Sequence, residues 1–440
     1  MAALSLHLFP GNYRDRYYIY RDHHLFGGTP MPGPASFFQD PLYRNSVFIM
    51  LNTGLVTLFN YVFWILAVRV VSSEHVGLAT AVVSASMMIA AISRLGMDDS
   101  ITRFLPQSKD RGGFVNALIA IMLAVTVVVL FGFMAGLRQI SPALLFLREW
   151  QYLLPFVVLV FLTSVCNMQG TTLVASRRAD LALMEYALLF LRIPLLLITG
   201  SLGLFGIFLA LDVTYLIMML VGVVFLYRLG IARDLRVDFG QARRTMKYSL
   251  SNYLALIMYT APYTLIPILV VNVMGASQQA YYYAAYSIAA FLLLVPDAIV
   301  ASMFVEGAHE RPLRETAKKS LRFALAILVP LVLAAVFFGD NLLRLFSPEH
   351  SAAAYELLLL LALSSVFYAV IEVYFTVMQV RKNLVMLNFV RFSVTALTLG
   401  LGYVLLQKLG LIGIGYAWFL ACVIVSAISG WKMMSRKTWE

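Results

Sequence analysis

Two arginines lie inside long apolar runs of this sequence, where an ionisable side chain is costly and needs a partner or a cavity. Arg192 stands 14 positions after Arg178, a rise of ~21 Å if the intervening run is helical. Arg391 stands only nine positions after Lys382, so its long side chain can reach the nearer end of its run. Both guanidinium groups are therefore candidate site residues, and Arg192 is the more deeply placed of the two.

Three carboxylates lie within other apolar runs, namely Asp212, Asp297 and Glu372. Each can bind a proton or a sodium ion, or pair with one of the arginines. A simple ion pair that joins two helices is the alternative for any one of them. The remaining acidic residues near the ends of runs are expected to be solvated or to cap helices: Glu185, Glu306, Asp98 and Asp99.

Polar residues also recur at helical spacing along otherwise apolar runs. Tyr368 and Glu372 share one face of their run, while Asn252, Tyr259 and Tyr263 share a face of another, and Asn45 and Asn52 are seven residues apart. Hydrogen bonds between helices explain part of this pattern. A water-filled cavity explains the rest, with amides and tyrosines able to contact a hydroxyl-rich ligand.

The composition shows what kind of element must position these residues. The 440 residues are 61% hydrophobic and only 12% charged, with a mean hydropathy of +0.84, whereas soluble domains are about 25% charged. The chain is therefore an integral membrane protein. Neither a phosphate-binding GxxxxGK[ST] loop nor a cluster of His, Asp or Glu with catalytic or metal spacing occurs, so we expect no ATPase, enzyme, cofactor or metal site.

The apolar runs are each about 20 residues long, the length of a membrane-spanning helix. They predict an all-α, multi-pass protein of twelve spans, at 46 to 68, 75 to 93, 114 to 137, 152 to 175, 181 to 200, 203 to 226, 248 to 274, 281 to 304, 320 to 338, 353 to 378, 384 to 406 and 411 to 432.

The basic residues predict the orientation. Lysine and arginine collect in short cytoplasmic loops. With both termini inside, 26 of the 33 basic residues lie in cytoplasmic segments, five lie outside and two lie within spans. The net charge of +11 thus reflects membrane topology, and no nucleic-acid partner is expected.

An internal repeat divides the chain. GLFGIFLA at 203–210 and GLIGIGYA at 410–417 are 207 residues apart. The repeat predicts two pseudo-symmetric six-helix bundles in parallel orientation that enclose a site at their interface. We therefore expect a flexible tail at 1–43, a first lobe at 44–230, a basic linker at 231–247 and a second lobe at 248–440.

Several sequence segments resemble those of a known family. SRLGMDDSITRFLPQ (93–107), GLFGI (203–207), ASMFVEGAHE (301–310) and the twelve-span layout are similar to polysaccharide biosynthesis proteins, the Wzx-like flippases of the MOP (multidrug/oligosaccharidyl-lipid/polysaccharide) exporter superfamily. The resemblance implies a MATE-like fold with two lobes around a central cavity. It also implies transport of a polyprenyl-phosphate- or pyrophosphate-linked oligosaccharide from the cytoplasmic to the outer leaflet of a prokaryotic plasma membrane.

That activity assigns roles to the residues above. Arg192 and Arg391, with Arg44 and Lys247 at the cytoplasmic mouth, would attract the phosphate. Sugar contacts would come from Asn52, Asn252, Tyr259, Tyr263 and Tyr368, and an H⁺ or Na⁺ ion would couple at Asp212, Asp297 or Glu372. Membrane lipids, and a glycan polymerase or glycosyltransferases, are the expected partners. The alternatives are a cation-coupled multidrug exporter of the MATE type and a non-transporting scaffold for glycan synthesis.

Overall fold

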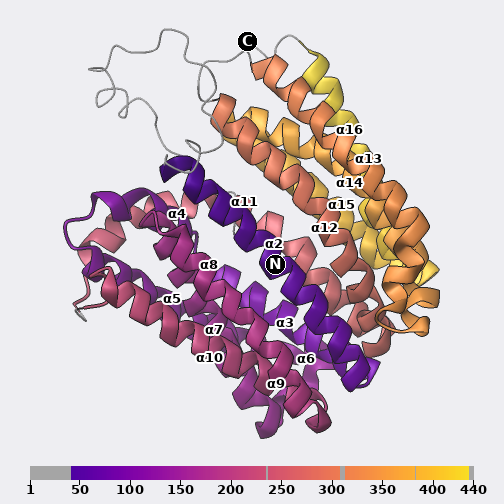
Figure 1. The fold of residues 1–440 in the computed structure, drawn as a ribbon, viewed down its shortest axis with the longest axis horizontal. Helices are drawn as coiled ribbons and strands as arrows, with labels where there is room; N and C mark the ends of the chain where they lie inside the picture. Colours follow the sequence, from indigo (N-terminus) through magenta and orange to yellow (C-terminus); the bar gives the residue numbers. More distant parts are fainter. Residues whose placement is uncertain (1–40, 234–235, 308–312, 382, 436–440) are drawn as a thin grey trace.

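The computed structural model describes residues 41–233, 236–307, 313–381 and 383–435, and these residues form an all-helical multi-pass membrane protein (Figure 1). Twelve helices are long and apolar enough to cross a membrane, which confirms the predicted number of spans. They are α2 (Pro41–Val70), α3 (Ser73–Ser93), α5 (Arg111–Ala135), α7 (Trp150–Ala175), the pair α8 (Ala179–Ala187) and α9 (Arg192–Thr199), α10 (Leu204–Arg228), α11 (Phe239–Met274), α12 (Ala276–Gly307), α13 (Leu313–Arg344), α14 (Pro348–Val380), α15 (Leu384–Leu409) and α16 (Ile412–Met434).

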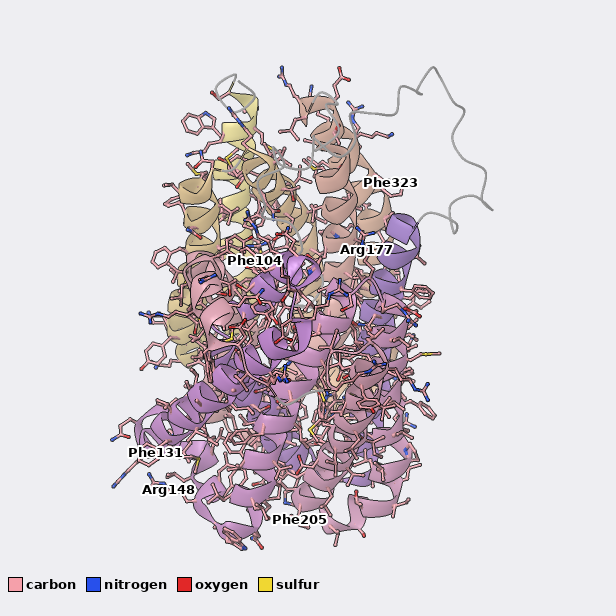
Figure 2. All side chains as sticks on the ribbon, turned by 90° about the vertical axis from the view of Figure 1, so that its left-hand side faces the viewer. Phe104, Phe131, Arg148, Arg177, Phe205 and Phe323 are labelled. Atoms are coloured by element: carbon pink, nitrogen blue, oxygen red, sulfur yellow. The ribbon has the colours of Figure 1, made fainter. Side chains whose placement is uncertain are left out.

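The helices divide into an N-terminal lobe, α2 to α10, and a C-terminal lobe, α11 to α16 (Figure 1). In the view of Figure 2, Phe104 and Arg177 lie near mid-height, whereas Phe131, Arg148 and Phe205 lie in the lower part. We call the end with the Arg-rich α3–α5, α7–α8 and α10–α11 connections the basic end, and the other the opposite end.

Side-chain caps start several helices at the basic end. The Asp110 carboxylate accepts a hydrogen bond from the Gly113 amide at 2.8 Å to start α5, and Asp238 accepts from the Gln241 amide at 2.9 Å to start α11. Asn383 caps α15 in the same way. These caps satisfy backbone donors that have no partner inside their helix, and they fix where each span enters the apolar layer.

Two connections differ from the prediction. Helix α11 begins at Phe239, so the second half of the predicted linker at 231–247 is helical, because the Asp238 cap nucleates the turn before the apolar run begins. The loop after α3 contains a short amphipathic helix, α4 (Met97–Phe104), with Met97, Ser100 and Ile101 buried. The predicted tail at 1–43 lies outside the described residues up to position 40.

The fifth span is interrupted. Between α8 and α9 the backbone forms a 3₁₀ segment, Leu188–Leu191. Pro194 has no N–H to donate to the carbonyl of Phe190, so the regular α-helical ladder cannot continue through this point. The span therefore changes from α-helical to 3₁₀ geometry over these residues and then continues as α9.

Helix α11 joins the lobes along the length of α3. At the basic end, the Tyr253 hydroxyl donates to the carbonyl of Ile92 at 2.9 Å, and further along the Thr264 hydroxyl contacts the sulfur of Met88 at 3.3 Å. A second seam lies between α2 and α12, where Trp64 meets Tyr283 and Tyr61 meets Phe291. The Tyr61 and Trp64 contacts lie in the second half of α2, toward the opposite end.

The repeat detected in the sequence corresponds to a repeated backbone conformation. Gly203 (φ +62°) and Gly410 (φ +68°) both lie in the left-handed region just before α10 and α16. Three residues later, Gly206 and Gly413 each approach the preceding helix so closely that a Cβ atom would lie 1.9 Å from the carbonyl oxygen of Thr199 and 2.2 Å from that of Leu405. Glycine is required at all four positions by backbone geometry.

Substituting Gly206→Ala or Gly413→Ala should therefore destabilise the protein. The methyl group meets a backbone oxygen that cannot rotate away, and such overpacking costs about 1–3 kcal/mol. Thermal unfolding in detergent micelles measures the effect. Gly132→Ala is the matched control, because nothing lies within 4 Å of its Cβ position, and an equal Tm for all three variants would contradict the assignment.

Candidate functional site

A buried ion pair lies in the C-terminal lobe. Arg391 on α15 donates from Nη1 and Nη2 to the two carboxylate oxygens of Glu372 on α14, at 2.5 and 3.0 Å. The side chains are only 8% and 4% exposed. This two-pronged geometry is the strongest form of an arginine–carboxylate contact, and it neutralises both charges away from water.

Aromatic rings and a second carboxylate surround this pair. The Arg391 guanidinium lies over Phe375 at 3.9 Å and over Tyr259 at 4.7 Å from the ring centroids. Asp297 on α12 is also buried and lies within electrostatic reach of both Glu372 and Arg391. Asp297 thus adds a second carboxylate near the Arg391–Glu372 pair, so this cluster carries excess negative charge whenever both carboxylates are ionised.

Arg192 has a different environment. It begins α9, directly after the 3₁₀ segment, and is 1% exposed. Its guanidinium carbon lies 4.9 Å from the centroid of the Phe63 ring, and its Nε and Nη2 atoms have no hydrogen-bond partner. Among the described residues no carboxylate forms an ion pair with it. Arg192 is a buried cation with two guanidinium nitrogens that have no hydrogen-bond partner in the structure.

A chain of rings, which we call the aromatic band, connects the two arginines. It runs from the N-terminal to the C-terminal lobe, with centroid separations of 4.9 to 6.2 Å. Its members, in order from Arg192 to Arg391, are Phe63, Trp64, Tyr283, Tyr286, Tyr263 and Tyr259. The aromatic band therefore links Arg192 with Arg391, which are far apart in sequence, across the contact between the lobes.

Of the other predicted residues, Tyr368 is linked to this band through Trp418. Trp418 packs against both Tyr263 and Tyr368. Asp212 and Asn52 lie half-buried on α10 and α2, and each has a side-chain oxygen without a hydrogen-bond partner. The side chains of Arg44, Lys247 and Asn252 lie outside the part of the structure that is described.

One acidic residue lies in an environment that the sequence did not predict. Glu185 was expected to be solvated or to cap a helix, but it is 0% exposed inside the N-terminal lobe, with no partner for either carboxylate oxygen. Its position near the start of a span suggested an interfacial location. Helices α7 and α10 cover it instead, and the sequence contains no pattern from which this packing could be predicted.

The fold is that of MOP superfamily transporters. A MATE family multidrug resistance transporter in an inward-facing conformation matches with a TM-score of 0.69 and 16% identity, over 86% of this chain and 94% of that one. The lipid II flippase MurJ in an inward closed conformation matches with a TM-score of 0.71 and 11% identity, over 88% of each chain.

A third match is a MOP superfamily transporter from Pyrococcus furiosus, for which a binding pocket of reversed polarity suggests a different function. It has a TM-score of 0.63 and 16% identity, over 92% of this chain and 98% of that one. No protein-family model and no curated protein sequence matches this chain.

The Arg391–Glu372 pair predicts a strong non-additivity. Glu372→Leu alone leaves a buried guanidinium without its carboxylate, and breaking a buried pair from one side costs about 3–5 kcal/mol. Glu372→Leu combined with Arg391→Leu removes both charges and should recover most of that loss. Thermal or denaturant unfolding in detergent measures the cycle, and additive losses in the double variant would show that the two side chains do not interact.

Proposed function

We propose that this protein is a flippase that moves a polyprenyl-(pyro)phosphate-linked oligosaccharide from the cytoplasmic to the outer leaflet. The observation that carries the proposal is Arg192, a fully buried cation with unpartnered donors beside the contact between the lobes. An uncompensated charge inside a membrane protein is retained only where a ligand or an ion meets it.

The three chemical parts of such a substrate match three parts of the site. The phosphate would bind the Arg192 guanidinium through charge-assisted hydrogen bonds. Sugar rings would lie along the aromatic band, where tyrosines offer flat apolar faces with polar edges. The polyprenyl tail would stay in the bilayer, which requires no further polar groups from the protein.

Arg391 would act at a later stage than the sequence suggested. In this conformation Glu372 occupies both of its Nη groups, so a phosphate could reach Arg391 only after that pair opens. Protonation of Glu372, with Asp297 beside it, would weaken the pair and free the guanidinium. Coupling to H⁺ or Na⁺ at Asp297 and Glu372, or at Asp212, is therefore part of the proposal.

Alternating access would be produced by rocking of the two lobes. Helix α11 keeps contact with α3 from Tyr253 to Thr264, which makes this seam the natural axis. The Trp64–Tyr283 contact on the other seam would open and close. A plasma membrane location beside glycosyltransferases or a glycan polymerase would supply the substrate and remove the product.

A cation-coupled multidrug exporter is the second candidate. Its support is the likeness to the MATE family transporter together with the buried carboxylates Asp297 and Asp212. Arg192 argues against it, because an unpaired guanidinium beside the aromatic band would repel a cationic drug. Efflux of the cationic dye ethidium from proteoliposomes separates this function from lipid flipping.

Replacing Arg192 should impair flipping directly. Loss of a charged hydrogen bond of about 1.5–3 kcal/mol corresponds to about a 10- to 100-fold lower rate at subsaturating substrate. The assay follows a fluorescent N-acetylglucosaminyl-pyrophosphoryl-polyprenol in proteoliposomes that contain wild type, Arg192→Gln or Arg192→Lys.

Arg344→Gln serves as the charge-matched control, because this arginine is exposed and pairs only with the neighbouring turn at Asp340. Full flipping activity in Arg192→Gln would remove the electrostatic part of the proposal. Ethidium efflux by the wild type without lipid flipping would favour the exporter.

A further inference from the structure

The N-terminal lobe contains a buried acidic group that belongs to neither arginine site. Glu185 on α8 is 0% exposed, and neither of its carboxylate oxygens has a hydrogen-bond partner in the structure. An ionised carboxylate without a partner is among the most unfavourable groups that a protein interior can contain. In the absence of a basic partner, the carboxylate needs either a proton or a bound cation.

The neighbouring glutamine shows where that proton would lie. Gln169 on α7 is 2% exposed and donates from Nε2 to the carbonyl of Met219 at 3.1 Å. This bond fixes the amide, so its Oε1 atom is the acceptor that remains. Oε1 lies 2.7 Å from the position of a Cβ atom on Gly222, and Oε1 of Glu185 lies 3.0 Å from the same position.

Two acceptor oxygens therefore converge on one side of Gly222. Two acceptors repel each other unless a donor lies between them. A proton on Glu185 turns one of its oxygens into a donor on the side where Gln169 Oε1 is an unpartnered acceptor. A metal ion such as Ca²⁺ prefers six to eight oxygen ligands, many more than the two side chains bring here.

The groups around Glu185 neutralise little of its charge. Cys166 from α7 donates its thiol to the carbonyl of Tyr215 on α10 at 3.5 Å. Tyr186, from the same helix as Glu185, lies against Gly170 of α7 with its hydroxyl unpartnered. Tyr186 is also within electrostatic reach of Glu185 and of Arg94. Among the described residues no cation forms an ion pair with Glu185.

A pair of charged residues, Arg94 and Asp98, lies between Tyr186 and the basic end. Beyond Tyr186, Arg94 pairs with Asp98 at 3.1 Å, and the Asp98 side chain is 22% exposed. Thr171 on α7 donates to the same carboxylate at 3.1 Å. The partly exposed Asp98 carboxylate is therefore the group of this cluster that reaches solvent, whereas Arg94 stays charged and cannot relay a proton.

The corner that holds Arg94 and Asp98 contacts the other lobe. Arg94, Gly96 and Asp98 form the corner between α3 and α4, and a Cβ atom on Gly96 would lie 2.4 Å from the carbonyl oxygen of Ser249 on α11. Ser100 and Ser249 share a hydrogen bond at 2.6 Å. A movement of the lobes at this contact must displace the corner, and with it the Arg94–Asp98 pair.

We propose that Glu185, with the amide oxygen of Gln169 beside Gly222, is a proton-binding site of the N-terminal lobe. The site is separate from the aromatic band, and it exchanges its proton with water at the basic end when the corner between α3 and α4 moves against α11. The binding of the proton stands on the local geometry alone, whereas its use in transport rests on the proposed flippase function.

Infrared difference spectroscopy tests the proton directly. Purified protein in lipid vesicles is titrated with acid and base, in H₂O and in D₂O. The wild type and the control Glu356→Gln, which removes an exposed carboxylate, should show the carbonyl bands of protonated buried carboxylic acids, and Glu185→Gln should lack the component that Glu185 contributes. Gly222→Ala should shift that band, since its methyl group meets both oxygens.

Identical spectra for the wild type and Glu185→Gln would overturn the proposal. A band that appears only when sodium is removed, at constant pH, would overturn it as well, because the occupant would then be a metal cation. These outcomes do not depend on any transport activity.

The role in coupling is tested with the same fluorescent polyprenol-linked probe, with and without an imposed pH gradient. The gradient should stimulate wild-type flipping several-fold, and the ratio of the two rates should fall to about one in Glu185→Gln. An unchanged ratio in Glu185→Gln would overturn coupling through this site. If the wild type does not flip the probe at all, the flippase function fails, while the infrared band still decides whether Glu185 binds a proton.

Discussion

The cost of placing charge in an apolar interior governs the arrangement of this protein. Twelve spans leave little water inside, so each ionisable side chain there needs an opposite charge, a donor or a ligand. Arg391 and Glu372 meet this need through two parallel hydrogen bonds, although Arg391 Nε has no partner. Arg192 and Glu185 have no opposite charge paired with them among the described residues, so they are the groups for which we propose a ligand and a proton.

The unsatisfied cation and the unsatisfied acid lie on the same interrupted span. Glu185 belongs to α8 and Arg192 begins α9, with the 3₁₀ segment Leu188–Leu191 between them. Glu185 lies inside the N-terminal lobe, and Arg192 lies against Phe63 beside the lobe contact. One span thus contains a buried acid in its first half and a buried cation in its second, and the two charges do not form an ion pair with each other.

Sequence periodicity and charge were sufficient for the number of spans, because apolar length and loop composition are local properties. They were also sufficient to select Arg192, Arg391, Asp297 and Glu372 as buried ionisable residues. They could not show that Arg391 is paired and Arg192 is not, since that depends on how α14 and α15 pack. Nor could they place Glu185, whose position in sequence is interfacial but whose burial is decided by Gln169 and Gly222 on two other helices. The 3₁₀ segment at Leu188–Leu191 was not predicted either, although Pro194 indicates an irregular hydrogen-bond pattern in this span.

The paired glycines have a mechanical consequence. Gly206 and Gly413 bring the sixth helix of each lobe into backbone contact with the carbonyls of Thr199 and Leu405 on the helix before it. A helix locked at van der Waals distance against its neighbour cannot slide along it without opening a void that lipid chains cannot fill. Each lobe is therefore rigid where its last two helices meet. A large conformational change is then expected at the surface between the lobes and not within either lobe.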